Sequence, residues 1–254
     1  MKSTTDLHWS ARARSVEDDA EVNIMDVFQR ELEYQYIARY LRPEMNLLEV
    51  GCGNGFSTNR FRPLVRHVDA FDYSEEMITR ARAAYGETNN RFLHDDVLEP
   101  KSLAAAYDAV LCVRVLINLR DIAEQRRAIA SLTRLVRPEG VLILAEGYQE
   151  GFTALTALRQ ELGLPPVEPA AINVYATLDQ IRPTFMAGFA LEDEFHLGMY
   201  DYLTRVVYPL VAGPDNVRHN TVFSEKCFHL ARAFNPDAVK HLSRMRGLVL
   251  RRLA

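Results

Sequence analysis

The sequence predicts an α/β fold in which helices cover both faces of a doubly wound, mostly parallel, seven-stranded sheet. Strand and helix patterns alternate from about residue 23 to residue 146, which is typical of a parallel sheet with helical crossovers. Three glycines lie together between the first strand pattern and the next helix. The run YDAVLCV, residues 107–113, is almost continuously apolar, as expected for a strand buried on both faces.

The size and composition of the chain indicate one globular domain. The 254 residues are 48% hydrophobic and 25% charged, which is enough apolar material for a sizeable core. A formal net charge of -4 provides no overall positive field to attract a polyanion. We therefore expect no nucleic-acid partner.

The chain start and the cysteines give two further expectations. The first residues mix charges and lack the apolar stretch of a secretory signal, and no window approaches the length of a membrane span, so we expect a cytoplasmic protein without a membrane partner. The cysteines Cys52, Cys112 and Cys227 are far apart and lack the spacing of a zinc site or redox pair. We predict buried thiols and no metal.

Each expected element has a local sequence signal. Apolar positions recur at helical spacing over residues 23–41, and Pro43 ends that helix. Ser74 is a predicted helix N-cap, and Gly86 is the predicted end of the same helix. Further helices are expected over 56–64 and from Asp121 to Val136, and strands over 47–50, 67–73, 91–96, 107–113 and 141–146, with a turn at 138–140.

The pattern changes after residue 146. A helix ending at Gly163, a proline-rich stretch and a second helix begun by Thr177 with Gln180 predict an insertion that covers the sheet edge. Strand patterns return at 189–198 and 247–253. We divide the single domain into an N-terminal helical cap (1–45), a ligand-binding core (46–146), an insertion or lid (147–190) and C-terminal strands with substrate-side elements (191–254).

The glycine turn is the strongest functional signal. Gly51, Gly53 and Gly55 fall within five residues although the chain has only 12 glycines. Glycine allows the backbone to bend sharply and approach a ligand. A dinucleotide fingerprint requires a third glycine where Phe56 stands, and the GK[ST] sequence of a phosphate-binding loop is absent.

The segment LLEVGCGNG, residues 47–55, resembles the first motif of class I S-adenosylmethionine-dependent methyltransferases. The resemblance implies a Rossmann-like fold, S-adenosylmethionine as cofactor, and cofactor contacts from Glu49, Asn54 and the three glycines. Asp72 ends the second strand, where a carboxylate can accept both ribose hydroxyls.

The resemblance extends in outline to further residues between 23 and 146. It implies that Tyr73 and Met77 lie near the adenine, and that Asp96, with Asp95 as the competing choice, contacts the adenine amino group beside Val97. It also implies that the strand end at Cys112 and Val113 passes near the methionine moiety. The helix before the first strand contributes Gln29 and Arg30 as further candidates.

Catalytic candidates follow the carboxyl ends of the strands, where ligands of open parallel sheets bind. Glu146 follows the fifth strand, and Tyr148, His196 and His219 are further candidate bases. Arg114 could pair with a carboxylate of the cofactor or the acceptor; the alternative is a surface ion pair with Asp108 or Asp121.

We therefore expect a methyltransferase that acts on the oxygen or nitrogen of a small molecule such as a sugar or another metabolite. Aromatic residues after position 147 supply walls for an enclosed acceptor pocket. An NAD-type oxidoreductase and a non-catalytic cofactor-binding protein are the alternatives. The oligomeric state stays open, with a homodimer as one alternative.

Overall fold

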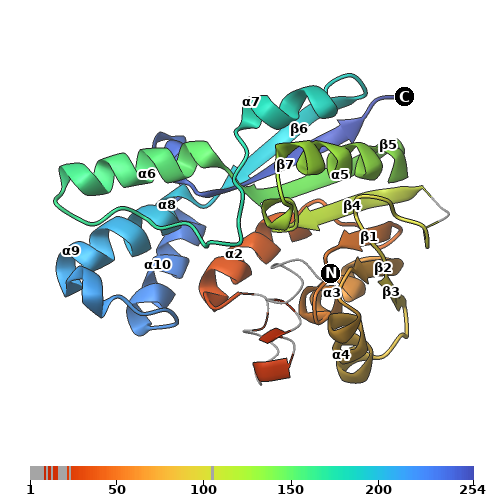
Figure 1. Cartoon of the computed structure of the whole chain (residues 1–254), viewed down its shortest axis with the longest axis horizontal. Helices are drawn as coiled ribbons and strands as arrows, with labels where there is room; N and C mark the ends of the chain where they lie inside the picture. The colour runs from red at the N-terminus through yellow and green to blue at the C-terminus, as the bar shows by residue number, and fades with distance from the viewer. Residues whose placement is uncertain (1–8, 10, 13, 17–21, 23, 104–105) are drawn as a thin grey trace.

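A computed structural model describes residues 9, 11–12, 14–16, 22, 24–103 and 106–254 of the chain. Its centre is a seven-stranded sheet with the order β3-β2-β1-β4-β5-β7-β6 (Figure 1), which confirms the predicted fold class. The strands are β1 Asn46–Val50, β2 His67–Asp72, β3 Asn90–His94, β4 Tyr107–Val113, β5 Val136–Gly147, β6 Phe189–His196 and β7 Met245–Arg252.

The direction of the strands places several chain segments at one edge of the sheet. All neighbouring pairs from β3 to β5 are parallel, whereas β7 runs antiparallel to both β5 and β6. Val50 at the end of β1 is in register with Phe71 of β2 and Cys112 of β4. The strand order reverses at β1, and ligands of such sheets bind outside the carboxyl ends at this point.

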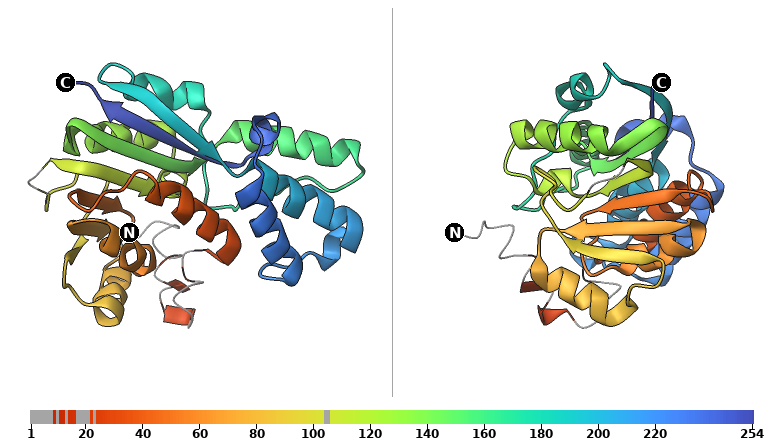
Figure 2. Two further views of the ribbon diagram at one scale, coloured as in Figure 1. Left: turned by 180° about the vertical axis from the view of Figure 1, so that it is seen from behind. Right: turned by 90° about the vertical axis from the view of Figure 1, so that its right-hand side faces the viewer.

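Helices pack on both faces of the sheet (Figure 2). Helices α2 Val27–Ala38, α3 Phe56–Phe61 and α4 Glu75–Tyr85 share one hydrophobic cluster with the strands, and α5 Ile122–Leu135 and α7 Leu178–Ile181 share the other. The side chains of β1 alternate between the clusters, since Leu47 belongs to the first and Leu48 to the second. Because successive side chains face opposite clusters and both faces are covered, a central strand is apolar at almost every position.

The predicted caps are present. The Ser74 hydroxyl accepts from the Met77 N–H, and Gly86 ends α4. Asp121 caps α5, and Thr177 and Gln180 form the reciprocal capping pair of α7. Pro183 lies in a short 3-10 turn, Arg182–Thr184, that follows α7.

The turn predicted at residues 138–140 is wrong. These residues form an irregularity within β5, where the partner of Tyr107 is Val136 and the partner of Ala109 is Val141. Glu139 has φ 60°, which bends the strand locally without ending it. The predicted N-terminal helix is also shorter, since α2 begins at Val27, and part of the N-terminal cap lies outside the described residues.

Helices between β6 and β7 were not predicted. Helix α6 follows β5 and α8 follows β6, so both begin at the edge that carries the glycine turn (Figure 1). Together with α2, the helices of this C-terminal part enclose a third hydrophobic cluster. Helix α6 Gln149–Glu161 corresponds to the helix predicted to end at Gly163. The other helical elements are α8 Gly198–Tyr202, the π-helical segment Leu203–Val207, α9 Tyr208–Ala212, α10 Val222–Ala233 and the 3-10 turns Arg62–Leu64, Leu116–Asn118, Pro214–Asn216 and Asp237–Leu242.

Within the described residues, none of the helices combines the length and the apolar character that crossing a membrane requires. Over the same residues, no cluster of three or more His, Cys, Asp or Glu side chains is arranged to hold a metal ion. The three cysteines are free and buried, as predicted.

Candidate cofactor and acceptor site

The glycine turn after β1 has the backbone conformation that its sequence predicts. Gly51, Gly53 and Gly55 have φ values of 66°, 54° and 77°, a region that side chains with a Cβ rarely adopt. A Cβ on Gly51 would lie 2.3 Å from Cγ2 of Val115. The turn therefore requires glycine at this position for both conformation and space.

Asp72 joins the tip of β2 to this turn. Its Oδ2 accepts the N–H of Gly53 at 2.9 Å, and its Oδ1 accepts the N–H of Ser74 at 2.9 Å. The side chain faces the turn and is buried, and burial raises its pKa against the opposing effect of these two hydrogen bonds. Each carboxylate oxygen retains capacity for a second hydrogen bond.

Glu49 connects β1 to α3. Its two oxygens accept the hydroxyls of Ser57 and Thr58 at 2.5 Å each. Burial outweighs these hydrogen bonds and raises the pKa of Glu49 to about 7. A buried carboxyl that titrates near neutrality beside the glycine turn is a typical feature of a functional site.

A pocket at this edge brings together predicted residues from separate elements. Arg30 comes from α2, Glu49 from β1, Gly51 from the turn and Val113 from the end of β4. The guanidinium of Arg30 lies 4.2 Å from the centre of the Phe56 ring. The other lining residues are Glu33, Tyr34, Ile37, Val50, Ser57, Arg60 and Phe61.

Three more predicted cofactor residues lie close to the glycine turn in sequence or at the tip of β2: Asn54, Tyr73 and Met77. Asn54 is completely buried in the turn, and Met77 is buried in the first turn of α4. Tyr73 follows Asp72 and is 37% exposed.

Asp95 and Asp96, the two competing candidates, have different environments in the loop after β3. Both oxygens of Asp95 accept backbone N–H groups of its own loop, from Asp96, Lys101 and Ser102. Asp96 is exposed and uses Oδ1 for the N–H of Leu98. Asp95 thus organises the loop, while Asp96 presents its carboxylate at the surface.

Arg114 does not form the surface pairs considered from sequence. Its guanidinium binds Glu33 of α2, with Nε 3.2 Å from Oε2 and a second hydrogen bond to Oε1. The two expected alternatives are otherwise engaged, since Asp108 pairs with Arg137 and Asp121 caps α5. The ion pair at β4 is therefore mostly buried and links the sheet to α2.

Gln29 extends this ion pair into the C-terminal helices. Its side-chain amide donates to Oε1 of Glu33 at 3.1 Å and accepts from Arg244 at 3.4 Å. Arg244 in turn binds Oδ1 of Asp201 at 2.9 and 2.7 Å. Sequence reasoning missed Arg244 and Asp201, because they follow segments without any recognised motif.

The geometry of Glu146 favours a positioning role over the predicted role as a base. Oε1 accepts the N–H groups of Val115 and Leu116 at 2.9 and 3.0 Å, and the side chain is fully buried. Burial raises its pKa to about 7 despite these hydrogen bonds. Glu146 thus holds the segment that follows β4 and carries Arg114.

His219 forms an Asp–His pair with a buried carboxylate. Its Nδ1 lies 3.4 Å from Oδ2 of Asp26, whose Oδ1 accepts the Tyr200 hydroxyl at 2.7 Å. Burial raises the pKa of Asp26, but hydrogen bonds from His219, Gln29 and Tyr200 outweigh it and lower the value to about 2. The histidine side chain is 37% exposed, so it can meet a ligand.

The two remaining candidate bases are buried. The His196 Nδ1 accepts the N–H of Gly198 at 3.2 Å, and burial lowers its pKa. Tyr148 is 1% exposed, and burial raises its pKa well above the ordinary value. Neither geometry favours proton transfer with a ligand.

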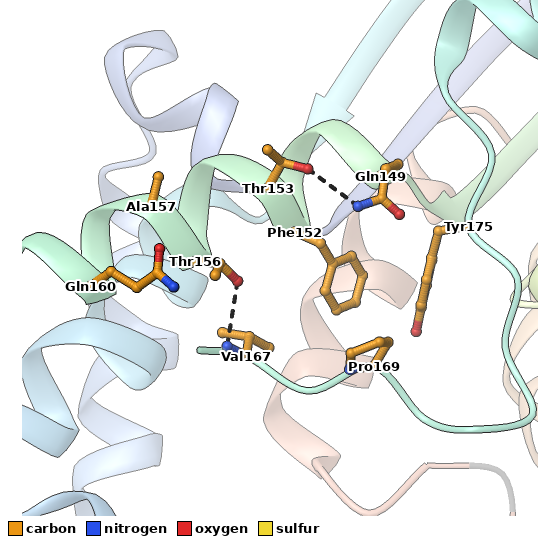
Figure 3. A pocket seen from close by; sticks show the side chains of 9 residues that line it. All are labelled: Gln149, Phe152, Thr153, Thr156, Ala157, Gln160, Val167, Pro169 and Tyr175. Atoms are coloured by element: carbon orange, nitrogen blue, oxygen red, sulfur yellow. Dashed lines mark hydrogen bonds between the residues drawn. The ribbon is translucent and has the colours of Figure 1, made fainter. Parts of the chain in front are cut away.

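A second hollow, which we call the outer groove, lies between α6 and the segment that leads to α7 (Figure 3). The rings of Phe152 and Tyr175 lie 4.2 Å apart, centre to centre. The groove is lined by Gln149, Phe152, Thr153, Thr156, Ala157, Gln160, Val167, Pro169 and Tyr175.

The strand order, the glycine turn and the acid at the tip of β2 together define a Rossmann-like protein with a nucleoside-type site at the switch point. The sequence profile of the methyltransferase-domain family matches residues 47–140, which contain the turn, Asp72 and Arg114. The matched segment and the fold are similar to those of class I S-adenosylmethionine-dependent methyltransferases.

Known proteins resemble the chain over different lengths. A Mycolicibacterium smegmatis protein named "Probable S-adenosylmethionine-dependent methyltransferase" is 28% identical over 165 residues, 65% of this chain and 59% of that protein. Nodulation protein S of Rhizobium tropici is 31% identical over 101 residues, 40% of this chain and 42% of that protein. The chain spans about half the length of the curated relatives it matches.

The solved structure of N-methyltransferase NodS from Bradyrhizobium japonicum with S-adenosyl-L-homocysteine has the same fold. The TM-score is 0.62 at 15% identity, and the match covers 98% of this chain and 99% of that one.

Proposed function

We propose that the protein transfers a methyl group from S-adenosylmethionine to an oxygen or nitrogen atom of a small-molecule acceptor. The observation that carries the proposal is the hydrogen bond between Gly53 and Asp72, which fixes a carboxylate beside the bare glycine turn within the family-matched segment. The same carboxylate retains lone pairs for the ribose hydroxyls.

The residues around the turn fit this cofactor. The carboxylates of Glu49 and Asp72 lie near the turn and suit a cation better than a phosphate, and the guanidinium of Arg30 can pair with a carboxylate. Bound S-adenosylmethionine supplies an electrophilic methyl group on a positively charged sulfur. Asp96 is our proposed partner of the adenine amino group, and Met77, Tyr73 and Val97 are the proposed residues around the ring.

The oxidoreductase alternative is disfavoured by the same turn. Phe56 occupies the third glycine position of a dinucleotide fingerprint and begins α3. The centre of its ring lies 4.2 Å from the guanidinium of Arg30, so a bulky side chain occupies the position where the fingerprint requires glycine.

We propose His219 as the group that accepts the acceptor's proton. A carboxylate at Nδ1 holds the imidazole in the tautomer whose Nε2 can accept a proton. Glu146 supports the reaction indirectly, because its hydrogen bonds position the segment with Arg114. Arg114 is a positioning residue in this proposal, since Glu33 occupies its guanidinium.

A labelling experiment tests the function. The protein is incubated with S-adenosylmethionine carrying a tritiated methyl group and a cell extract separated into small-molecule, protein and nucleic-acid fractions. We expect label in the small-molecule fraction, and label in the protein or nucleic-acid fraction alone would contradict the proposed acceptor class.

The same assay tests His219. His219→Ala should reduce the rate about 100-fold or more without loss of cofactor binding, because general bases typically contribute this much. His229→Ala is the matched control, since this histidine is 53% exposed on α10 and pairs with Glu225. An unchanged rate in His219→Ala would eliminate the proposed base.

A further inference from the structure

We infer that the outer groove binds an uncharged, mainly apolar arm of the acceptor, and that it selects the acceptor at a distance from the methylated atom. The groove lies between α6 and the segment before α7, outside the pocket at the glycine turn (Figure 3). This inference rests on the proposed function, because it assigns the substrate class of the same site.

Among the described residues that line the groove, none has an acidic or basic side chain. Two of its polar groups are bound within the groove wall: the Gln149 amide donates to Thr153 at 3.2 Å, and the Thr156 hydroxyl accepts the Val167 N–H at 3.4 Å (Figure 3). A charged arm would lose hydration here without gaining a counterion. An apolar arm would gain by covering Phe152, Ala157 and Pro169.

The inner end of the groove reaches the sheet edge that carries the glycine turn. A Cβ on Gly147, the last residue of β5, would lie 2.6 Å from the Tyr175 ring. Strand β4 separates β5 from β1, and adjacent strands lie about 4.8 Å apart. Leu144 of β5 is level with Val50 at the end of β1, and Gly147 lies three residues further along. The end of β5 is thus about 14 Å from the end of β1, a distance that an elongated acceptor molecule can bridge.

The aromatic wall of the groove is fixed by the buried charge network. The guanidinium of Arg244 lies 5.6 Å from the centre of the Phe152 ring, and two hydrogen bonds to Asp201 hold it there. On the other ring, the Tyr175 hydroxyl accepts from Asn173 at 2.9 Å. The wall is therefore formed before an acceptor binds, and the neighbouring Arg244 cation is neutralised by Asp201.

Three eight-carbon probes test the inference. Octyl β-glucoside is neutral, octanoate is an anion and octylamine is a cation at neutral pH; each is titrated below its micellar concentration while S-adenosylhomocysteine saturates the cofactor site. Calorimetry should give at least tenfold weaker binding for the two charged probes than for octyl β-glucoside. Equal affinities for the three would overturn the inference.

A charge placed in the groove locates the binding. Ala157→Arg introduces a long cation at an exposed groove position of α6, and Ala84→Arg introduces the same side chain at an exposed position of α4. We expect loss of octyl β-glucoside binding in the first variant and unchanged binding in the second. Unchanged binding in both would show that the probe binds elsewhere and would overturn the inference.

Titration of the cofactor product in the same variants separates the two proposals. If Ala157→Arg still binds S-adenosylhomocysteine and its binding of octyl β-glucoside is unchanged, the assignment of the groove is wrong and the proposed function is not affected. If the protein binds octyl β-glucoside selectively but does not bind S-adenosylhomocysteine, the proposed function is wrong. The groove can then no longer be assigned to a methyl acceptor.

Discussion

The backbone N–H of Gly53 donates to Oδ2 of Asp72 over 2.9 Å, which joins the turn after β1 to the tip of β2. The two residues are 19 positions apart in sequence, so the contact depends on the parallel pairing of the two strands. A change at either residue should therefore alter the geometry of the whole site.

Gly51→Ala should destabilise the fold. The residue would adopt a positive φ, which costs about 1–2 kcal/mol, and its Cβ would overlap Val115, which costs a further 1–3 kcal/mol or so. Denaturant unfolding measures the sum. Val115→Ala in the same chain should recover the overlap part alone, and full recovery would show that the backbone conformation is unimportant.

The ion pair between Glu33 and Arg114 should be strongly coupled. Glu33→Gln leaves a mostly buried guanidinium without its carboxylate and should reduce the free energy of unfolding by about 3 kcal/mol. Adding Arg114→Gln removes the uncompensated charge, so the double variant should be more stable than the single one. Additive losses in this double-mutant cycle would contradict a coupled pair.

Glu146→Ala should loosen the segment after β4. Two backbone N–H groups, of Val115 and Leu116, lose a charged acceptor, which predicts a loss of about 2–3 kcal/mol in unfolding free energy. Glu146→Gln keeps one carbonyl acceptor and should lose less. A stable Glu146→Ala protein whose methyl transfer alone is abolished would instead favour a direct catalytic role.

Glu49 should make the ligand-free protein less stable as the pH rises. Its pKa is about 7 in the folded protein, above the ordinary value of 4.5, so the folded state binds more protons between these values. Its contribution is complete below about pH 4.5 and is lost by about pH 7, at no more than about 1.4 kcal/mol per pH unit.

Urea unfolding of wild-type protein and Glu49→Gln at intervals across this pH window measures the effect. The variant should show a shallower decline, and a residual slope is expected because burial also raises the pKa of Glu146 to about 7. Identical slopes in the two proteins would assign the titration to other groups.

The core of the fold was predictable because its signals are local. Alternating apolar runs, the caps at Ser74 and Asp121, and the glycine turn all act within a few residues, and the structure confirms them. In the region between β6 and β7, Thr221 caps α10, but this signal was not recognised from the sequence. Helices α8 and α9 of this region have five residues each, too short for a hydrophobic repeat. Helix α8 packs against α2 and α10 in the third hydrophobic cluster, and Tyr208 of α9 stacks on Phe223 of α10.

The site was predictable only where a motif carries it. Glu49, Gly51, Val113 and Arg30 line one pocket, and their contact with the cofactor stays a prediction. The partners of Arg114 and His219 could not be predicted from the sequence. Glu33 is 81 positions from Arg114, and Asp26 precedes β1 whereas His219 follows β6. The first pair depends on how α2 packs against the sheet, and the second on how the start of α2 packs against the C-terminal part of the chain.

Calorimetric titration with S-adenosylhomocysteine tests the central claim most directly. Wild-type protein should bind the compound at one site, Asp72→Asn should bind at least tenfold more weakly, and Asp179→Asn, at an exposed position of α7, should bind like wild type. Far-ultraviolet circular dichroism checks that all three are folded. No binding by the wild type, or equal binding by folded Asp72→Asn, would contradict the assignment of the glycine turn as the cofactor site.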